Sequence, residues 1–133
     1  MNLYQQFSTN DGMEKGGIDL AYGDVKIRVA RAGGSNHKYG KSITERMKPF
    51  KRAYETGTLS DEDSDKIMRE VYADSIILGW ENVTDKDGNY LEFNRENCIK
   101  LMSDLPELFR DIMAQSQKVA NYRIEEIEAD AKN

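Results

Sequence analysis

The feature that most constrains the fold is the run from Trp80 to Asn94, in which an Asp-Gly pair at 87–88 stands between two short apolar segments. Glycine reaches positive φ without strain, so Asp-Gly is a strong signal for a tight, hairpin-like turn. The pattern predicts a turn that joins residues 80–83 to residues 90–93. A helix is expected to end at Trp80, and Asn94 is expected to cap the next helix.

Helical periodicity occurs in four stretches, with apolar side chains recurring every three or four residues. Pro49 interrupts the first stretch and removes a helical donor, so a kink or break is expected near residues 45–48. Ser60, followed by three acids, predicts the start of the second helix, and Pro106 suits the first turn of the last helix. The four helical stripes, which are mainly apolar, are Tyr39, Ile43, Met47, Phe50 and Tyr54; Ile67, Met68, Val71, Tyr72, Ser75 and Leu78; Cys98, Ile99, Met102 and Leu105; and Phe109, Ile112, Met113, Ser116, Val119, Ala120, Arg123 and Ile127.

Residues 16–32 alternate with period two on both sides of a Gly-Asp turn at 23–24, which is typical of a β-hairpin. A lone hairpin is marginal in water, so its apolar face is expected to pack on helices or to pair with another chain. The predicted fold is mainly α: a small helical domain of about four helices with an N-terminal β-hairpin. We expect a flexible N-terminus over 1–15, a single helical domain over 16–128 that includes the hairpin, and a frayed C-terminus over 129–133.

Length and charge limit the classes of protein that fit. The chain has 133 residues and a net charge of -5, which suits one domain with a thin core. No run approaches the roughly 20 apolar residues of a membrane span, and the first residues do not form a secretory signal. Residues 1–56 carry a net charge of +4 and residues 57–133 one of -9. Such polarity would align the molecule on a partner or on a second copy of itself, although two solvated faces explain it equally well.

Few residues could carry metal or nucleophilic chemistry. A calcium loop with Gly88 in its sixth place would need acidic ligands first and twelfth, but Val83 and Asn94 stand there. His37 and Cys98 are the only histidine and cysteine, too few for a zinc site of about four ligands, and no nucleophile motif surrounds them. We therefore expect a non-catalytic protein with no metal and no cofactor.

Basic side chains interleave with aromatic ones on the first helical stretch, a pattern that would suit phosphates and stacked bases. The aromatic residues share the apolar face of the helix, however, so core packing is the favoured interpretation. We expect no nucleic-acid partner and no membrane. The basic residues are Lys38, Lys41, Arg46, Lys48, Lys51 and Arg52.

Protein binding is the role that the remaining features favour. Trp80 either plugs a small core under the turn or anchors an interface, where tryptophan is enriched. The apolar stripe of the last helix suits an apolar helical segment of a partner. The residues expected to contact a partner are Trp80, Phe109, Ile112, Met113 and Val119.

From residue 76 onwards the chain presents, in order, a helix, Trp-Glu-Asn-Val, Asp-x-Asp-Gly, an Asn cap, Leu-Pro-x-Leu-Phe and a long helix with an acidic end. This series resembles the small tail assembly chaperones of long-tailed, siphophage-like bacteriophages, over about residues 42–133. The resemblance implies a helical protein of virion morphogenesis. It would bind the tape measure protein and help to recruit tail tube protein subunits in the host cell cytoplasm, and it would be absent from the mature virion. The alternative function is a phage-encoded inhibitor that binds a host defence protein.

The resemblance also implies a short form of the protein and a longer, frameshifted form. The codons GCA-AAA-AAC for Ala131-Lys132-Asn133 would contain the heptamer A-AAA-AAC, on which a paused ribosome can slip back by one base. This chain is then expected to be the short form. An ordinary polar ending is the alternative explanation of these residues.

Overall fold

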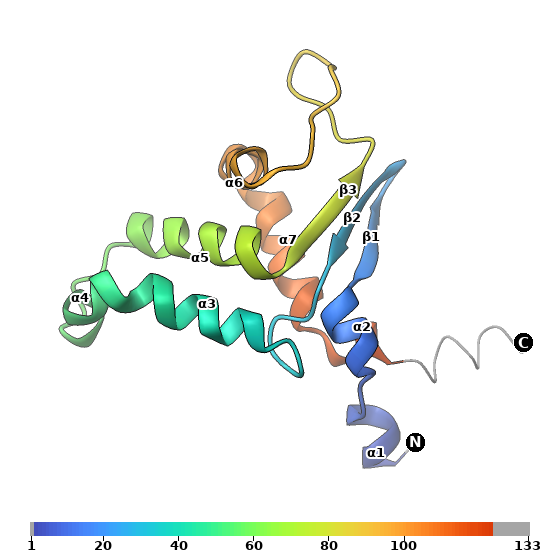
Figure 1. The fold of residues 1–133 in the computed structure, drawn as a ribbon, viewed down its shortest axis with the longest axis horizontal. Coiled ribbons are helices and arrows are strands. Elements are labelled where there is room, and N and C mark those ends of the chain that lie inside the picture. The colour runs from blue at the N-terminus through green and yellow to red at the C-terminus, as the bar shows by residue number, and fades with distance from the viewer. Residues whose placement is uncertain (1, 124–133) are drawn as a thin grey trace, which may run out of the picture.

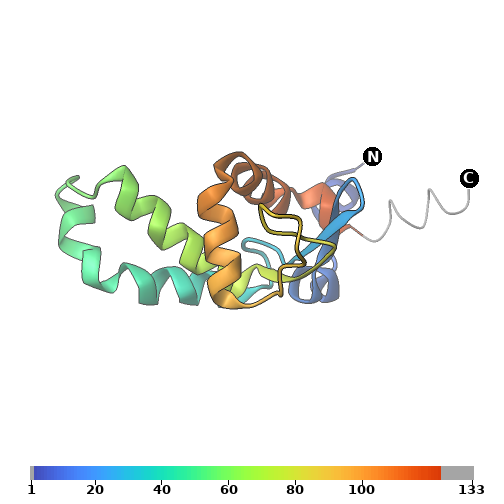
Figure 2. The ribbon, with the colours of Figure 1, turned by 90° about the horizontal axis from the view of Figure 1, so that it is seen from above.

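The computed structural model describes residues 2–123 and shows a small antiparallel sheet from which a helical arm extends (Figure 1). Seen from above, the arm and the sheet-bearing body lie end to end (Figure 2). The elements are α1 (Leu3–Phe7), α2 (Asp11–Gly16), β1 (Ile18–Tyr22), β2 (Val25–Val29), α3 (His37–Met47), η1 (Lys48–Phe50), α4 (Lys51–Glu55), α5 (Asp61–Ser75), β3 (Ile77–Glu81), α6 (Arg95–Asp104), α7 (Pro106–Gln117) and η2 (Val119–Tyr122).

The sheet contains three strands in the order β1-β2-β3, all antiparallel. The predicted hairpin is confirmed, with Tyr22 paired to Val25 next to the turn. Ile27 and Val29 of β2 point into the core, while Lys26 and Arg28 lie on the exposed face. This alternation buries one face of the sheet and leaves the other in water.

The third strand corrects the expectation that a helix runs to Trp80. α5 ends at Ser75, and β3 places Trp80 opposite Ile27 of β2. A short apolar run such as 76–80 fits a helix or a buried strand equally well by periodicity. The unpaired edge of β2 favours the strand, because its backbone groups need hydrogen-bond partners. The fold is therefore helix-rich with a three-stranded meander, and the hairpin is only part of its sheet.

The arm consists of α3, η1, α4 and the first half of α5. α3 ends at Met47 and the chain continues through the 3-10 turn η1, so the predicted break at Pro49 is confirmed. The predicted cap at Ser60 is also confirmed, since its side chain accepts a hydrogen bond from the Asp63 N–H at 3.1 Å. α3 packs along α5, yet neither α3 nor α4 contains a buried residue.

The core lies between the sheet, the second half of α5, α6 and α7. Tyr72 is central to it: its ring meets Phe109 edge-on at 5.3 Å, and its hydroxyl shares a hydrogen bond with Ser116 at 3.1 Å. The buried cluster is Ile27, Val29, Tyr72, Ile76, Ile77, Trp80, Val83, Cys98, Met102, Phe109 and Ile112. These residues come from the sheet and from three helices, so they join the elements of the body into one core.

The last helix is shorter than predicted. α7 ends at Gln117, and the chain then enters η2. The Asn121 side chain donates to the Gln115 carbonyl at 2.9 Å, and Tyr122 is fully buried with its hydroxyl bonded to the Val29 carbonyl at 3.2 Å. Burial of the Tyr122 ring explains why the helix breaks. Ile127, which the predicted stripe included, lies outside the described residues, as does the expected frayed end.

The N-terminal segment, expected to be flexible, forms the helices α1 and α2. These helices have only five and six residues, which is too short for a helical period to be visible in the sequence. Glu14 of α2 is buried and pairs with Arg31, Oε2 to Nε at 3.4 Å. It also accepts hydrogen bonds from the backbone N–H and the hydroxyl of Ser35. These contacts fix α2 to the segment that follows β2.

Candidate partner-binding groove

After β3, the run from Trp80 to Asn94 forms a projecting loop at the top of Figure 1. Thr84 bridges to Tyr90 in antiparallel fashion, and the Asp85 N–H donates to the Asn89 carbonyl at 2.8 Å. Gly88 has a φ of 83°, as an Asp-Gly turn requires. The predicted hairpin-like turn is therefore confirmed.

The loop is held in shape by its own polar contacts. Oδ1 of Asp85 accepts hydrogen bonds from the N–H groups of Asp87 and Asn89, at 2.9 and 3.0 Å. The Trp80 indole N–H donates to the Leu91 carbonyl at 2.9 Å and fixes the returning side of the loop to β3. Trp80 is 8% exposed, so it plugs the core beneath the turn, the first of the two interpretations left open by the sequence.

The second wall is α6, which begins where predicted: the Asn94 side chain accepts a hydrogen bond from the Asn97 N–H at 2.8 Å. The helical period separates two faces of α6. Cys98 and Met102 point into the core. The side that lines the groove carries Asn97, Lys100, Leu101 and Asp104, and Leu101 also packs against the core.

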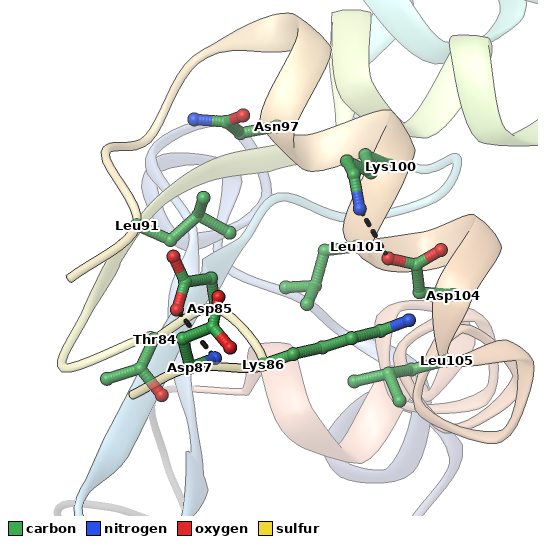
Figure 3. Close-up of a pocket in the computed structure, with 10 residues that line it drawn as sticks. All are labelled: Thr84, Asp85, Lys86, Asp87, Leu91, Asn97, Lys100, Leu101, Asp104 and Leu105. Atoms are coloured by element: carbon green, nitrogen blue, oxygen red, sulfur yellow. Dashed lines mark hydrogen bonds and ion pairs between the residues drawn. The ribbon is translucent and has the colours of Figure 1, made fainter. Parts of the chain in front are cut away.

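An open groove of about 570 Å³ lies between the loop and α6 (Figure 3). Its apolar lining comes from Leu91 of the loop, Leu101 of α6 and Leu105 at the junction with α7, and Leu105 is 48% exposed. A smaller hollow of about 220 Å³ shares Leu101 and Leu105 and continues along Val25 and Leu108. The two hollows form a continuous apolar strip on a chain that is 32% charged.

Charged side chains form the rim of the groove. Lys100 donates to Asp104, Nζ to Oδ2 at 2.9 Å, and this hydrogen bond holds the pKa of Asp104 below its usual value. The charge of Lys86 acts in the same direction. Figure 3 shows Lys86 extended from the loop toward Asp104 and Leu105. Across residues 81–111 there are eight acidic and four basic side chains, so the groove lies in an acidic segment.

The five residues predicted to contact a partner lie in the core or against it. Trp80, Phe109 and Ile112 are buried, with Ile112 at 0% exposure. Met113 and Val119 are half-buried. In the folded chain a partner can reach Met113 and Val119, whereas contact with Ile112 would require the core to open.

The groove leucines were not among the predicted contact residues. Leu101 falls outside the apolar stripe predicted for its helix, and Leu105 was assigned to that stripe as a core residue. The sequence feature that could have indicated the groove is the Leu105-Pro106 junction. One helix ends before Leu105 and the next begins at Pro106, so this leucine stays half-exposed between them.

The groups considered for chemistry lie apart from the groove. Cys98 is fully buried, and burial, with a smaller contribution from Asp74, raises the pKa of its thiol to about 12. A thiol in this state is a poor nucleophile. His37 is exposed at the start of α3. Within residues 2–123, no cluster of three His, Cys, Asp or Glu side chains could hold a metal.

The fold and the groove define a small helix-rich protein with an open apolar surface strip. No helix in residues 2–123 is long and apolar enough to cross a membrane. A family described as YdaY prophage protein matches residues 34–133, and the chain belongs to this family. The match begins after the β1–β2 hairpin and includes both walls of the groove. No curated protein and no solved structure matches the chain. Membership of the YdaY prophage family indicates that the protein is phage-derived.

Proposed function

We propose that the chain is a phage tail assembly chaperone, a non-catalytic protein that binds the tape measure protein and helps to recruit tail tube subunits. It acts in the host cell cytoplasm and is absent from the mature virion. The observation that carries the proposal is the open apolar groove, which is built from residues 84–105, within the segment that resembles these chaperones. Membership of a prophage protein family supports a phage setting.

The chemistry of the groove suits this role. A tape measure protein is long and helical, and its apolar stripes are unpaired before the tail assembles, so it tends to aggregate. A small acidic protein that binds such a stripe covers apolar surface and adds charge to the complex.

Co-expression with the tape measure protein of the same prophage tests the proposal. The chain should raise the fraction of tape measure protein that stays in the supernatant and should elute with it. Ile112→Asp is unsuited as a binding variant, because it would bury a carboxylate in the core. An unchanged soluble fraction with and without the chain would contradict the proposal, and capture of a host protein in its place would favour the inhibitor.

The gene offers an independent check. A position beside a tape measure gene, together with an A-AAA-AAC heptamer and an open downstream frame, would support the proposal. Synonymous codons that interrupt the adenine run would remove this line of support.

A further inference from the structure

We infer that the groove between the 84–91 loop and α6 binds one amphipathic helix of the partner, with an apolar stripe flanked by Lys and Arg. The identity of the partner as a tape measure protein rests on the proposed function. The chemistry of the occupant follows from the groove itself.

The shape and lining of the groove favour a helix. Single exposed leucines are ordinary on protein surfaces, but here Leu91, Leu101 and Leu105 share one concavity of about 570 Å³. The second hollow extends the apolar strip past Leu108. A partner helix with apolar residues at i, i+3, i+4 and i+7 presents a strip of the same kind.

The walls are already formed, which lowers the entropic cost of binding. Asp85 closes the loop through two backbone hydrogen bonds, and the indole of Trp80 holds the Leu91 carbonyl. On the other side, Leu101 is carried by a capped helix whose buried residues, Cys98 and Met102, are in the core. The side chains that would contact a partner are thus held in place before it arrives.

Charge selects a basic partner. The segment 81–111 has a net charge of -4. The groove lining itself carries Asp85, Asp87 and Asp104 against Lys86 and Lys100, so its rim is also net acidic. Lysine and arginine beside the apolar stripe of a partner would be attracted to this surface, and acidic residues there would be repelled.

Lys86 is the residue that a basic partner must displace. Its side chain extends from the loop toward Asp104 and Leu105 (Figure 3). The methylene stem of a lysine covers apolar surface while its ammonium stays in water. Removal of this side chain would uncover the leucines and also remove the positive charge that a basic helix would meet.

Two synthetic helical peptides test the chemistry of the occupant. Both are about 18 residues long with leucine at i, i+3, i+4 and i+7, and they differ only in lysine or glutamate flanks. The lysine peptide should bind about tenfold tighter than the glutamate peptide at low salt. Fluorescence of Trp80, the only tryptophan, should change on binding, and amide shifts should move at the groove leucines. Equal affinity of the two peptides, or shifts confined to other surfaces, would overturn the inference.

Three variants test the surface. Leu105→Glu should weaken binding of the lysine peptide about tenfold or more, because it places a charge among the groove leucines. Leu78→Glu is the matched control, since Leu78 is 41% exposed and lies outside the groove. Lys86→Ala should instead tighten binding about threefold. If Leu105→Glu and Leu78→Glu behave alike while both remain folded by circular dichroism, the groove is not the binding surface.

The same variants separate this inference from the proposed function. If the tape measure protein binds the wild-type chain and Leu105→Glu equally, the groove inference fails and the chaperone proposal stands. If the lysine peptide occupies the groove but the tape measure protein does not bind, the chaperone proposal fails and the groove inference stands. Sedimentation equilibrium tests another occupant: self-association abolished by Leu105→Glu would show that a second copy fills the groove, which overturns the inference.

Discussion

The helical arm and the sheet-bearing body differ in what holds their side chains in place. In the body, Val29, Tyr72 and Ile112 are fully buried and contact residues distant in sequence. In the arm, α3 and α4 contain no buried residue, and Tyr54 is 67% exposed. Burial of apolar surface is the main source of folding free energy. The body should therefore determine global stability, while the arm should open locally at much lower cost.

The two regions also differ in charge. The arm segment 37–56 has six basic and two acidic side chains, whereas the groove segment 81–111 has four basic and eight acidic ones. The polarity noted in the sequence does not separate the two ends of the folded molecule, because the first half of α5, which completes the arm, carries four acidic side chains between residues 61 and 65. A basic partner is attracted to the acidic groove segment and repelled by the basic segment 37–56.

The largest expected effect is the difference in unfolding free energy between an alanine substitution in the body and one in the arm. Ile112→Ala removes a fully buried side chain from α7 and should lower the free energy of unfolding by about 2–5 kcal/mol. Ile43→Ala, at a half-buried position of α3, should cost less than about 1 kcal/mol, because little apolar area is lost from the core. Urea denaturation followed by circular dichroism measures both. Equal losses would show that the arm and the body form one packed unit.

An intermediate effect is expected where the arm meets the body. Asp74 of α5 binds Arg46 of α3, Oδ2 to Nη2 at 2.5 Å, and Arg95 of α6, Oδ1 to Nε at 2.8 Å. Burial tends to raise the pKa of Asp74, but the hydrogen bonds from Arg95 and Arg46 outweigh it and hold the pKa below its usual value. Asp74→Asn should therefore cost about 1–2 kcal/mol near neutral pH.

The pH dependence gives that prediction a definite sign. A carboxyl whose pKa is lowered by folding stabilises the folded state above its unfolded pKa of about 4, and this contribution is lost as the pH falls through the folded value. The difference in unfolding free energy between wild type and Asp74→Asn should be constant from about pH 7 to 5 and shrink below about pH 4. A difference that does not change down to pH 2.5 would show that the ionised carboxylate is not responsible.

The features that could be predicted from the sequence are those set by neighbouring residues. The Gly-Asp hairpin, the Ser60 and Asn94 caps, the break at Pro49 and the loop closed by Asp-Gly each depend on backbone geometry within a few residues. All of them appear in the structure at the expected positions.

The features that were missed depend on distant partners. β3 forms because β2 offers an unpaired edge about fifty residues away in sequence, and α7 stops where Tyr122 can be buried against Val29. Local periodicity carries no information on either contact. The groove was missed for the same reason: helical spacing assigned Leu105 to the core, although Leu105 is half-exposed in the structure. Its exposure depends on where the loop and α7 lie around it.

The smallest expected effect gives the most direct test of whether the arm unfolds separately from the body. Gly40 lies within α3, and a Cβ built there meets nothing within 4 Å. Gly40→Ala should therefore stabilise α3 by about 0.5–1 kcal/mol through helix propensity alone. If the arm unfolds separately, amide exchange should slow only in α3 and α4, with the global midpoint in urea unchanged. If the arm and the body unfold together, the midpoint should rise by the full amount and exchange in α7 should slow as well. The first outcome is expected, because α3 contains no buried residue whereas the body has a buried core. Stabilisation confined to a segment that opens by itself does not alter the free energy of unfolding the core.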